Sequence, residues 1–312
     1  MLAPNPDKLI EAYSRISSTN QRTLDTLTHV LTLFHAQDID CILLKGADLL
    51  SRLYGVRGIR SMVDADLLVR EQDLPAIDRI VRGLGFIPQI DGNPAYRDPE
   101  RLLLLDMITE VWYSNDVEGI WQRAMQRTVA GLPVKGMGTD DLLIYLAAYS
   151  VLHRGYFPSS FSKDIALLAV KETLDWGVIV GEALRWNLKV PLYHGLSYAS
   201  RHETVSIPDH VLRSLAPVRM MEKAWLAVLQ KLVTDQPLDD VGQLLMLIAL
   251  PWDMTWRRLK QIFWPSPTFL NYRYGLRGAS VPVRTRLARA LHLTMQAHRL
   301  AVRILYRLAW QY

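Results

Sequence analysis

The chain has 312 residues, of which 50% are apolar and 21% are charged, as expected of a folded soluble protein. Its one cysteine excludes an internal disulfide framework, and no apolar run approaches the roughly 20 residues of a membrane-spanning helix. The net charge of +5 is unevenly distributed, because eleven Lys and Arg but no acidic residue follow Asp253, which leaves −6 on the first 253 residues. The basic part should therefore pair with the acidic part or meet an anionic partner.

Residues 6–37 are predicted to form two helices, with Thr19 or Asn20 as the N-cap of the second. Cys41 opens a short apolar strand at about 41–44, and this position favours a buried, inert thiol over a nucleophile. The first residues lack a basic region followed by an apolar core, so we expect no signal peptide. The sequence therefore indicates a reducing compartment, the cytoplasm.

The stretch 42–69, ILLKGADLLSRLYGVRGIRSMVDADLLV, holds the main candidate residues. An apolar run ends at Lys45-Gly46, a short helical segment follows, and a basic turn leads into a second strand at about 65–69. Alternate strand residues share a face, so Asp64 and Asp66 point the same way. Neighbouring carboxylates repel unless a cation lies between them, and Mg²⁺ takes one or two carboxylates together with water and phosphates. A D-x-D can also be a solvated strand edge or a turn cap, but the Lys-Gly turn and basic loop favour a phosphate site.

The segments LLKGADLL and RGIRSMVDADLLV make the chain similar to the uncharacterised nucleotidyltransferase family, a branch of the polymerase-β-like nucleotidyltransferase superfamily. The resemblance implies an α+β fold: a minimal nucleotidyltransferase fold, with a small mixed β-sheet flanked by helices, followed by a helical C-terminal domain. It also implies that Asp64 and Asp66 bind metal and that Lys45 and Gly46 form the turn facing the triphosphate. Val63 and Ala65 stand where the family often has Gly and Ile, and neither change touches a ligand.

Two further positions in the loop before D-x-D suit a nucleotide. Arg57 and Arg60 lie there, and a guanidinium matches phosphate oxygens in a bidentate manner. We expect Arg60, with Ser61 beside it, to bind the nucleotide. The alternative is a solvated loop arginine.

The third carboxylate is expected on a strand at 101–113. In the family this strand carries an acid beside D-x-D that binds the catalytic metal and can take the proton of the attacking hydroxyl. The residues TEVWY resemble the family's strand end, with Glu110 as the acid and Trp112 in place of a His. This similarity favours Glu110 over Asp106, which has the same strand parity. If neither binds metal, Glu110 and Asp106 are surface carboxylates of an edge strand.

The remaining elements are predicted mainly from hydrophobic periodicity. They are a helix at 73–83, an extended piece from 85, a turn region at 91–100, a helix at 117–127, a short strand LPVKG, and helices at 139–153, 162–175, 177–187, 191–202, 219–233, 239–249 and 284–307. We place a catalytic domain at 1–137 and a helical, acceptor-binding domain at 138–312.

Parts of the second domain also resemble the family, namely TDDLLIYLAAYSVLHRG, KDIALLA and FWPSPTFLNYRYG, the last at 263–275. His153 and Asp164 are weaker site candidates there, because each can equally be a charge at a helix end. In the helix at 284–307, Arg299, Arg303 and Arg307 form a stripe with the apolar residues largely opposite. We expect this helix to dock by its apolar face and present its guanidinium groups to internal acids, RNA or an anionic membrane.

The expected activity is transfer of a nucleoside monophosphate from an NTP, such as ATP, to a hydroxyl of a small-molecule, peptide or saccharide acceptor, with Mg²⁺ or Mn²⁺. One alternative is an RNA- or tRNA-modifying nucleotidyltransferase of toxin–antitoxin type, for which only the basic tail argues. Another is a non-catalytic nucleotide-binding scaffold, against which the intact acids argue. No GxGxxG, Walker A, CxxC, HExxH or GxSxG motif occurs, which argues against dinucleotide, P-loop, zinc and serine-hydrolase chemistry.

Overall fold

The chain folds into two compact units, Met1–Leu142 and Leu143–Tyr312. The computed structural model describes residues 6–310 except 55–57, 92, 101, 204, 206, 239–240, 250–251, 266, 268–269 and 271–280. A mixed sheet flanked by helices, followed by a helical region, confirms the predicted fold class. The assignment of a catalytic domain to 1–137 and an acceptor-binding domain to 138–312 stays a prediction, because it concerns function as well as compactness.

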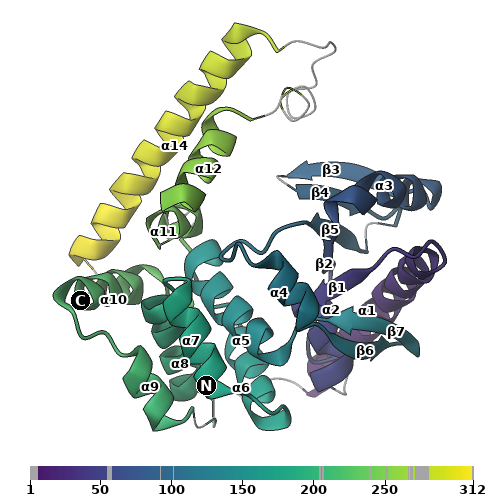
Figure 1. Cartoon of the computed structure of the whole chain (residues 1–312), viewed down its shortest axis with the longest axis horizontal. Helices are drawn as coiled ribbons and strands as arrows, with labels where there is room; N and C mark the ends of the chain where they lie inside the picture. The colour runs from purple at the N-terminus through teal and green to yellow at the C-terminus, as the bar shows by residue number, and fades with distance from the viewer. Residues whose placement is uncertain are drawn as a thin grey trace. The chain divides into compact units, whose positions relative to one another are not determined.

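The first unit is built around a mixed β-sheet (Figure 1). Its strands are β1 (Cys41–Leu44), β2 (Asp64–Val69), β3 (Ile87–Asp91), β4 (Asn93–Arg97), β5 (Leu104–Ile108), β6 (Met125–Val129) and β7 (Leu132–Gly136), in the spatial order β3-β4-β5-β2-β1-β7-β6. Its helices are α1 (Pro6–His35), α2 (Lys45–Leu49), a π-helical turn Leu50–Tyr54, a 3₁₀ turn Glu71–Asp73, α3 (Leu74–Gly83), α4 (Val117–Gln122) and the start of α5 (Thr139–Ala148). Strand β2 lies between β1, to which it is antiparallel, and β5, to which it is parallel.

The two helices predicted at 6–37 are one continuous helix, α1, so the prediction of a break near Thr19 and Asn20 was wrong. Threonine hydroxyls in this segment donate to carbonyls four residues earlier, as Thr23 does to Thr19 and Thr28 to Leu24. Such bonds are compatible with a helix interior. Asn20 is not a cap. Its side chain is fully buried and bonds to a distant loop.

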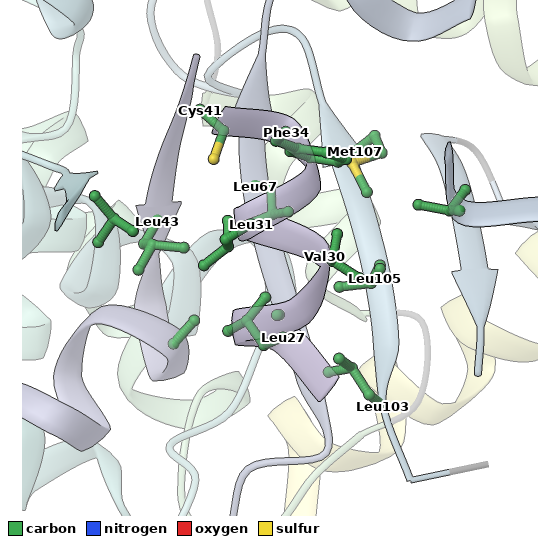
Figure 2. Packing of buried hydrophobic residues seen from close by; sticks show 14 of the residues in the cluster. Leu27, Val30, Leu31, Phe34, Cys41, Leu43, Leu67, Leu103, Leu105 and Met107 are labelled. Carbon is green, nitrogen blue, oxygen red and sulfur yellow. The ribbon is translucent and has the colours of Figure 1, made fainter. Parts of the chain in front are cut away.

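The core of the first unit covers one face of the sheet, because alternate strand residues point to that face. Figure 2 shows side chains of α1 packed against those of β1, β2 and β5, or beside them: Leu27, Val30, Leu31 and Phe34 with Leu43, Leu67, Leu103, Leu105 and Met107. All of these are at most 3% exposed. The burial of the odd-numbered residues of β2 and β5 leaves Asp64, Asp66 and Asp106 for the opposite face.

Two strands were not predicted. β4 lies within the region read as a turn at 91–100, and its Pro94 precedes the three residues that pair with β5, so the missing N–H is not needed there. β6 occupies the end of the helix predicted at 117–127, because α4 already ends at Gln122 and the chain pairs with β7 from Met125 on.

The second unit is helical. It contains the π-helical segment Tyr149–Arg154, which continues α5, and α6 (Phe161–Lys171), α7 (Trp176–Arg185), α8 (Lys189–His202), α9 (Asp209–Leu215), α10 (Met220–Leu232), α11 (Val241–Ala249), α12 (Trp252–Phe263) and α14 (Val283–Trp310). The predicted helices are present, while α9 and α12 were not predicted. Most of 263–275 lies outside the described residues. Among the helices that the structure describes, none has the length and apolarity needed to cross a membrane.

Helix α14 docks by a different face from the one predicted, although Arg299 and Arg303 are exposed as expected. Leu291, Met295 and Leu305 are 63%, 45% and 65% exposed, so they do not dock on the unit. Instead, Arg289 donates to the carbonyl of Ile262 and Arg307 to the carbonyl of Gln236. The guanidinium groups of the inner face satisfy carbonyl oxygens of the same unit, which a hydrophobic pattern alone does not reveal.

Candidate functional site

Asp66 and Asp106 are partners on neighbouring parallel strands. Asp66 on β2 pairs in register with Asp106 on β5 and, on its other side, with Leu44 at the end of β1. Paired residues of adjacent strands point to the same face, about 4.8 Å apart. Asp64 lies two residues before Asp66 and therefore shares its face. Asp66 is buried, at 5% exposure, while Asp64 and Asp106 are half-buried. Three carboxylates thus emerge on one side of the sheet.

Glu110 was predicted on the same strand as Asp106, and this placement was wrong. Strand β5 ends at Ile108, the chain bends at Thr109 and Glu110, and the Glu110 side chain is exposed. The strand ends because Val111, Trp112 and Tyr113 turn into the interior, where all three are buried. The role of Glu110 as a third ligand stays a prediction. The register now gives Asp106 the position beside Asp66.

Lys45 binds Asp66 directly. Its Nζ lies 2.9 Å from Asp66 Oδ1, and the two side chains are only 13% and 7% exposed. Lys45 adopts a φ of 50°, a left-handed conformation that is costly for a residue with a side chain. A buried ion pair persists only with good geometry, because both ions lose their hydration. The junction between β1 and α2 therefore places the ammonium group of Lys45 against the buried carboxylate of Asp66.

Arg60 lies over Gly46. A Cβ atom on Gly46 would lie 2.6 Å from Arg60 Nη1, so only glycine allows the guanidinium to approach the backbone this closely. The structure therefore brings together Lys45, Gly46 and Arg60, three of the four residues predicted to bind nucleotide. The fourth, Ser61, is adjacent in sequence and exposed. Arg57 lies outside the described residues.

Asn20 fixes the backbone that precedes the D-x-D strand. Its Nδ2 donates to the Arg60 carbonyl at 2.7 Å, and its Oδ1 accepts from the Met62 N–H at 2.9 Å. The side chain is completely buried in the middle of α1. One amide thus satisfies a donor and an acceptor of the loop, which a buried loop backbone requires. Asn20 therefore ties the loop carrying Arg60 to the main helix of the unit.

The carboxylates on this face have the donor chemistry of a magnesium site. Within the described part of the chain, no group of three or more His, Cys, Asp or Glu is arranged to hold a metal ion. Mg²⁺, however, is commonly held by one or two carboxylates with water and substrate phosphates. The in-register pair of Asp66 and Asp106 fits that smaller requirement.

These features agree with the comparison against known protein families. The family model described as "Uncharacterised nucleotidyltransferase" matches residues 3–202, which include the whole site. The chain belongs to this nucleotidyltransferase family. No curated protein shows significant similarity to the sequence.

Solved structures similar to this nucleotidyltransferase include the solution structure of the antibiotic-resistance factor ANT(2'')-Ia, at 18% identity and a TM-score of 0.42 over 59% of this chain and 100% of that chain. A crystal structure of ANT(2'')-Ia in complex with adenylyl-2''-tobramycin has 15% identity and a TM-score of 0.38 over 58% and 98% of the two chains. An antigenic nucleotidyltransferase-like protein from Paracoccidioides brasiliensis has 15% identity and a TM-score of 0.39 over 63% and 93%.

A second buried carboxylate supports the Lys45-Gly46 turn of the nucleotidyltransferase. Asp48 on α2 is 2% exposed and accepts a hydrogen bond from Arg52 Nη2 at 2.5 Å. Arg127 Nε of β6 lies 3.7 Å from Asp48 Oδ1. A Cβ on Gly136 of β7 would lie 2.8 Å from the same oxygen. The network therefore ties α2 to the far edge of the sheet. The spacing of Asp48 and Arg52, four residues apart on a helix, was the sequence signal for this pair.

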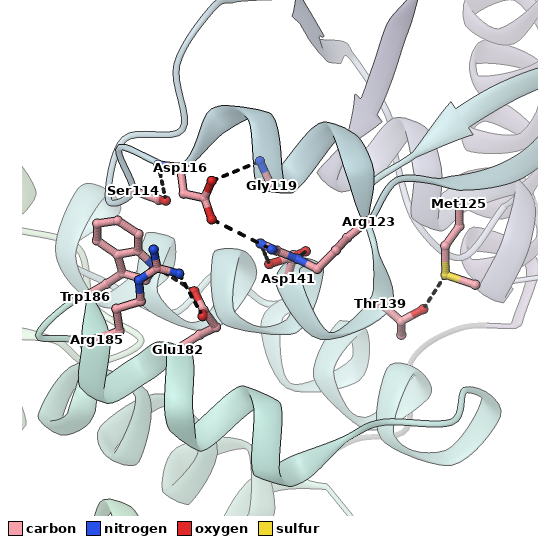
Figure 3. A network of polar contacts seen from close by, with 10 residues as sticks. All are labelled: Ser114, Asp116, Gly119, Arg123, Met125, Thr139, Asp141, Glu182, Arg185 and Trp186. Atoms are coloured by element: carbon pink, nitrogen blue, oxygen red, sulfur yellow. Dashed lines mark hydrogen bonds and ion pairs between the residues drawn. The ribbon is translucent and has the colours of Figure 1, made fainter.

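Another ion pair fixes the end of the first unit (Figure 3). Arg123, just after α4, donates from Nε and Nη2 to the two carboxylate oxygens of Asp141 on α5, at 2.8 and 3.0 Å. Asp116 caps α4 by accepting from the Gly119 N–H. Asp141 is 5% exposed, so this bidentate pair holds two helices in place rather than offering a charge to a ligand.

The two weaker candidates belong to the second unit. His153 lies in the last turn of the π-helical segment, and its ring stacks on that of Tyr149 with centroids 4.4 Å apart. Asp164 lies in the first turn of α6 and is 4% exposed. The structure places both near helix ends, where a charged side chain can have a purely structural role. A role in orienting acceptor or triphosphate stays a prediction.

Cys41 is buried in the core of the first unit. Burial raises the pKa of its thiol to about 12, so the thiolate is absent at neutral pH. This environment agrees with the inert thiol expected from the sequence.

Proposed function

We propose that the protein transfers a nucleoside monophosphate from an NTP to a hydroxyl of a small-molecule, peptide or saccharide acceptor. The observation that carries the proposal is the in-register pair of Asp66 and Asp106 beside a Lys45-Gly46 turn over which Arg60 lies. Carboxylates, a lysine and an arginine on one side of a sheet suit phosphoryl-type transfer, in which catalysis is mainly positioning and charge neutralisation.

In this proposal the residues act on the metal, on the phosphates or on the acceptor hydroxyl, and Asp106 acts on both the metal and the hydroxyl. Asp66 and Asp106 would hold a divalent metal, Mg²⁺ or Mn²⁺, and family similarity adds Asp64 as a further ligand and Glu110 as the alternative third acid. The metal supplies charge neutralisation at the phosphates and lowers the pKa of the acceptor hydroxyl. Lys45 leaves Asp66 Oδ1 for a phosphate oxygen, Arg60 binds the phosphates in a bidentate manner, and the backbone at Gly46 and Ser61 lines the same end. Asp106, which is half-buried, accepts the proton of the hydroxyl.

The acceptor is proposed to bind through the helical region, with His153 and Asp164 as the residues to examine first. We place the reaction in the cytoplasm, since the lone cysteine forms no disulfide and its thiol is buried.

The test is to determine which phosphate of the NTP is transferred, and to which acceptor. The purified protein is incubated with Mg²⁺ and each NTP labelled at the α- or the γ-phosphate, with a small-metabolite extract or with total RNA. The proposal expects α-label, but no γ-label, in a product of the metabolite incubation, together with release of pyrophosphate. Label in RNA would instead support the RNA-modifying alternative. Label from the γ-position would indicate a kinase and overturn the proposal.

A further inference from the structure

Helix α14 presents an apolar stripe to solvent. The exposed residues recur every three, four or seven positions, which places them on one side of a helix. They are Leu287 (65% exposed), Leu291 (63%), Met295 (45%), Val302 (52%), Leu305 (65%) and Tyr306 (69%). Uncovered apolar surface of this extent on one element marks an interaction site.

The orientation of the stripe is fixed by contacts on the opposite side of α14. Arg289 Nη2 donates to the Ile262 carbonyl at 3.1 Å, and Arg307 Nη1 donates to the Leu232 and Gln236 carbonyls at 3.4 and 3.2 Å. The Arg286 guanidinium lies 4.9 Å from the ring centre of Trp264. Figure 1 shows the helix running alongside α12 within its unit. Rotation of the helix to bury the stripe would break these contacts.

The charges beside the stripe identify the kind of partner. Arg284, Arg299 and Arg303 are exposed on α14, and no acidic residue follows Asp253 in the sequence. A second copy of the helix would bring two basic rows together without acids to pair with them. RNA would bind the arginines but leave the apolar side chains in water. A bilayer surface that contains anionic phospholipid satisfies both, because acyl chains cover the apolar face and headgroups neutralise the cations.

We propose that α14 binds peripherally to anionic membrane surfaces, lying in the interface with its apolar stripe inserted. A helix of 28 residues is about 42 Å long and offers a continuous contact. The helix lies on the bilayer rather than spanning it, since no helix in the described ranges is long and apolar enough to cross. This activity is independent of the proposed catalysis, because it rests on other residues.

The test is flotation of the full-length protein with vesicles of phosphatidylcholine alone or with about one-third phosphatidylserine. Wild type is expected to bind the anionic vesicles only, with binding that weakens as salt rises. The double variant Leu291→Gln/Met295→Gln should lose at least about tenfold in vesicle affinity through lost apolar insertion. Arg299→Gln/Arg303→Gln should lose on the order of tenfold or more on anionic vesicles.

Matched controls use the same changes at exposed positions elsewhere in the unit. Met220→Gln/Met221→Gln replaces side chains that are 85% and 80% exposed on α10 and should bind vesicles like wild type. Arg213→Gln/Lys223→Gln removes two exposed cations from α9 and α10 and should bind nearly as wild type. Circular dichroism of each variant checks that the helices are retained.

Three results would overturn the proposal. If the wild-type protein floats with neither kind of vesicle, the proposal is overturned whatever the variants show. Salt-dependent RNA binding that needs Arg299 and Arg303, without any vesicle binding, assigns the surface to RNA. Concentration-dependent dimers that Leu291→Gln/Met295→Gln abolishes, again without vesicle binding, assign the stripe to a second copy of the chain.

Discussion

Asp66 on β2 and Asp106 on β5 face the same side of the sheet as direct partners across two parallel strands, and the ammonium of Lys45 binds the first of them. The repulsion of two adjacent carboxylates is thus already partly neutralised by a residue of the chain itself. A metal that binds Asp66 must therefore compete with Lys45 or displace it. In the proposed reaction, the triphosphate provides the place to which the lysine moves.

Removal of the lysine makes this competition measurable. Lys45→Met leaves Asp66 buried without its ammonium partner, so the variant should lose about 3–5 kcal/mol of unfolding free energy in metal-free buffer. Mg²⁺ should raise its melting temperature more than that of wild type, because Asp66 is then open to the cation.

The matched control is Lys135→Met, which removes a lysine paired with Asp40 across a half-exposed contact. Its effect should be at most about 1 kcal/mol and should not depend on Mg²⁺. Equal responses of Lys45→Met and wild type to Mg²⁺ would separate Asp66 from any metal site.

Asn20→Ala tests the support of the nucleotide loop. The substitution leaves the Arg60 carbonyl and the Met62 N–H without their buried partner, so unfolding free energy should fall by about 2–4 kcal/mol. The NTP affinity should fall as well, since Arg60 loses its anchor. Gln21→Ala, one residue along the same helix, removes an exposed side-chain bond to Asp25 and serves as control in thermal unfolding and nucleotide titrations. Unchanged nucleotide affinity in a folded Asn20→Ala protein would exclude the loop from the binding site.

Gly46→Ala tests the close approach of Arg60. The added methyl collides with the guanidinium, which must move, so we expect KM for the NTP to rise about tenfold or more with a smaller change in stability. Gly83→Ala is the control, because a Cβ there meets no atom within 4 Å. If steady-state kinetics give the same KM for both variants, Arg60 does not contact the phosphates.

His194 predicts a pH dependence of the second unit. Burial lowers the pKa of this histidine from 6.5 to about 4, and its ring bonds to the Val233 carbonyl at 3.1 Å. The unfolded chain therefore binds a proton before the folded one does. Stability should be complete above pH 6.5 and fall by up to about 3 kcal/mol as pH drops towards 4. We would measure the unfolding free energy in urea at several pH values between 7.5 and 4.5. It should fall less steeply with decreasing pH for His194→Gln than for wild type or for His202→Gln, whose ring is exposed. Identical slopes in all three would contradict the assignment.

The sequence predicted those parts of the fold and site that depend on local pattern. The alternation of β2 gave the shared face of Asp64 and Asp66, because a buried strand must sort its side chains by parity. The end of β5 could not be predicted, since Val111 to Tyr113 leave the strand to fill the interior, and this shifts the choice from Glu110 towards Asp106. The contacts of Asn20 with Met62 and of Asp48 with Arg127 were missed because the partners lie far apart in sequence, whereas Asp48 and Arg52 carried a local signal. Buried polar contacts of that kind have no periodic signal.

The roles of Asp66 and Asp106 are tested most directly by measuring α-label transfer from Mg²⁺–NTP by wild type, Asp66→Asn, Asp106→Asn and Glu110→Gln, with Glu118→Gln as a surface control whose partner is Arg70. We expect the two Asp variants to lose activity by about 10³-fold or more, Glu110→Gln to lose much less, and Glu118→Gln to resemble wild type. Circular dichroism must show that both Asp variants remain folded. Full activity in a folded Asp66→Asn or Asp106→Asn protein, or a larger loss in Glu110→Gln than in Asp106→Asn, would contradict the assignment of the in-register pair.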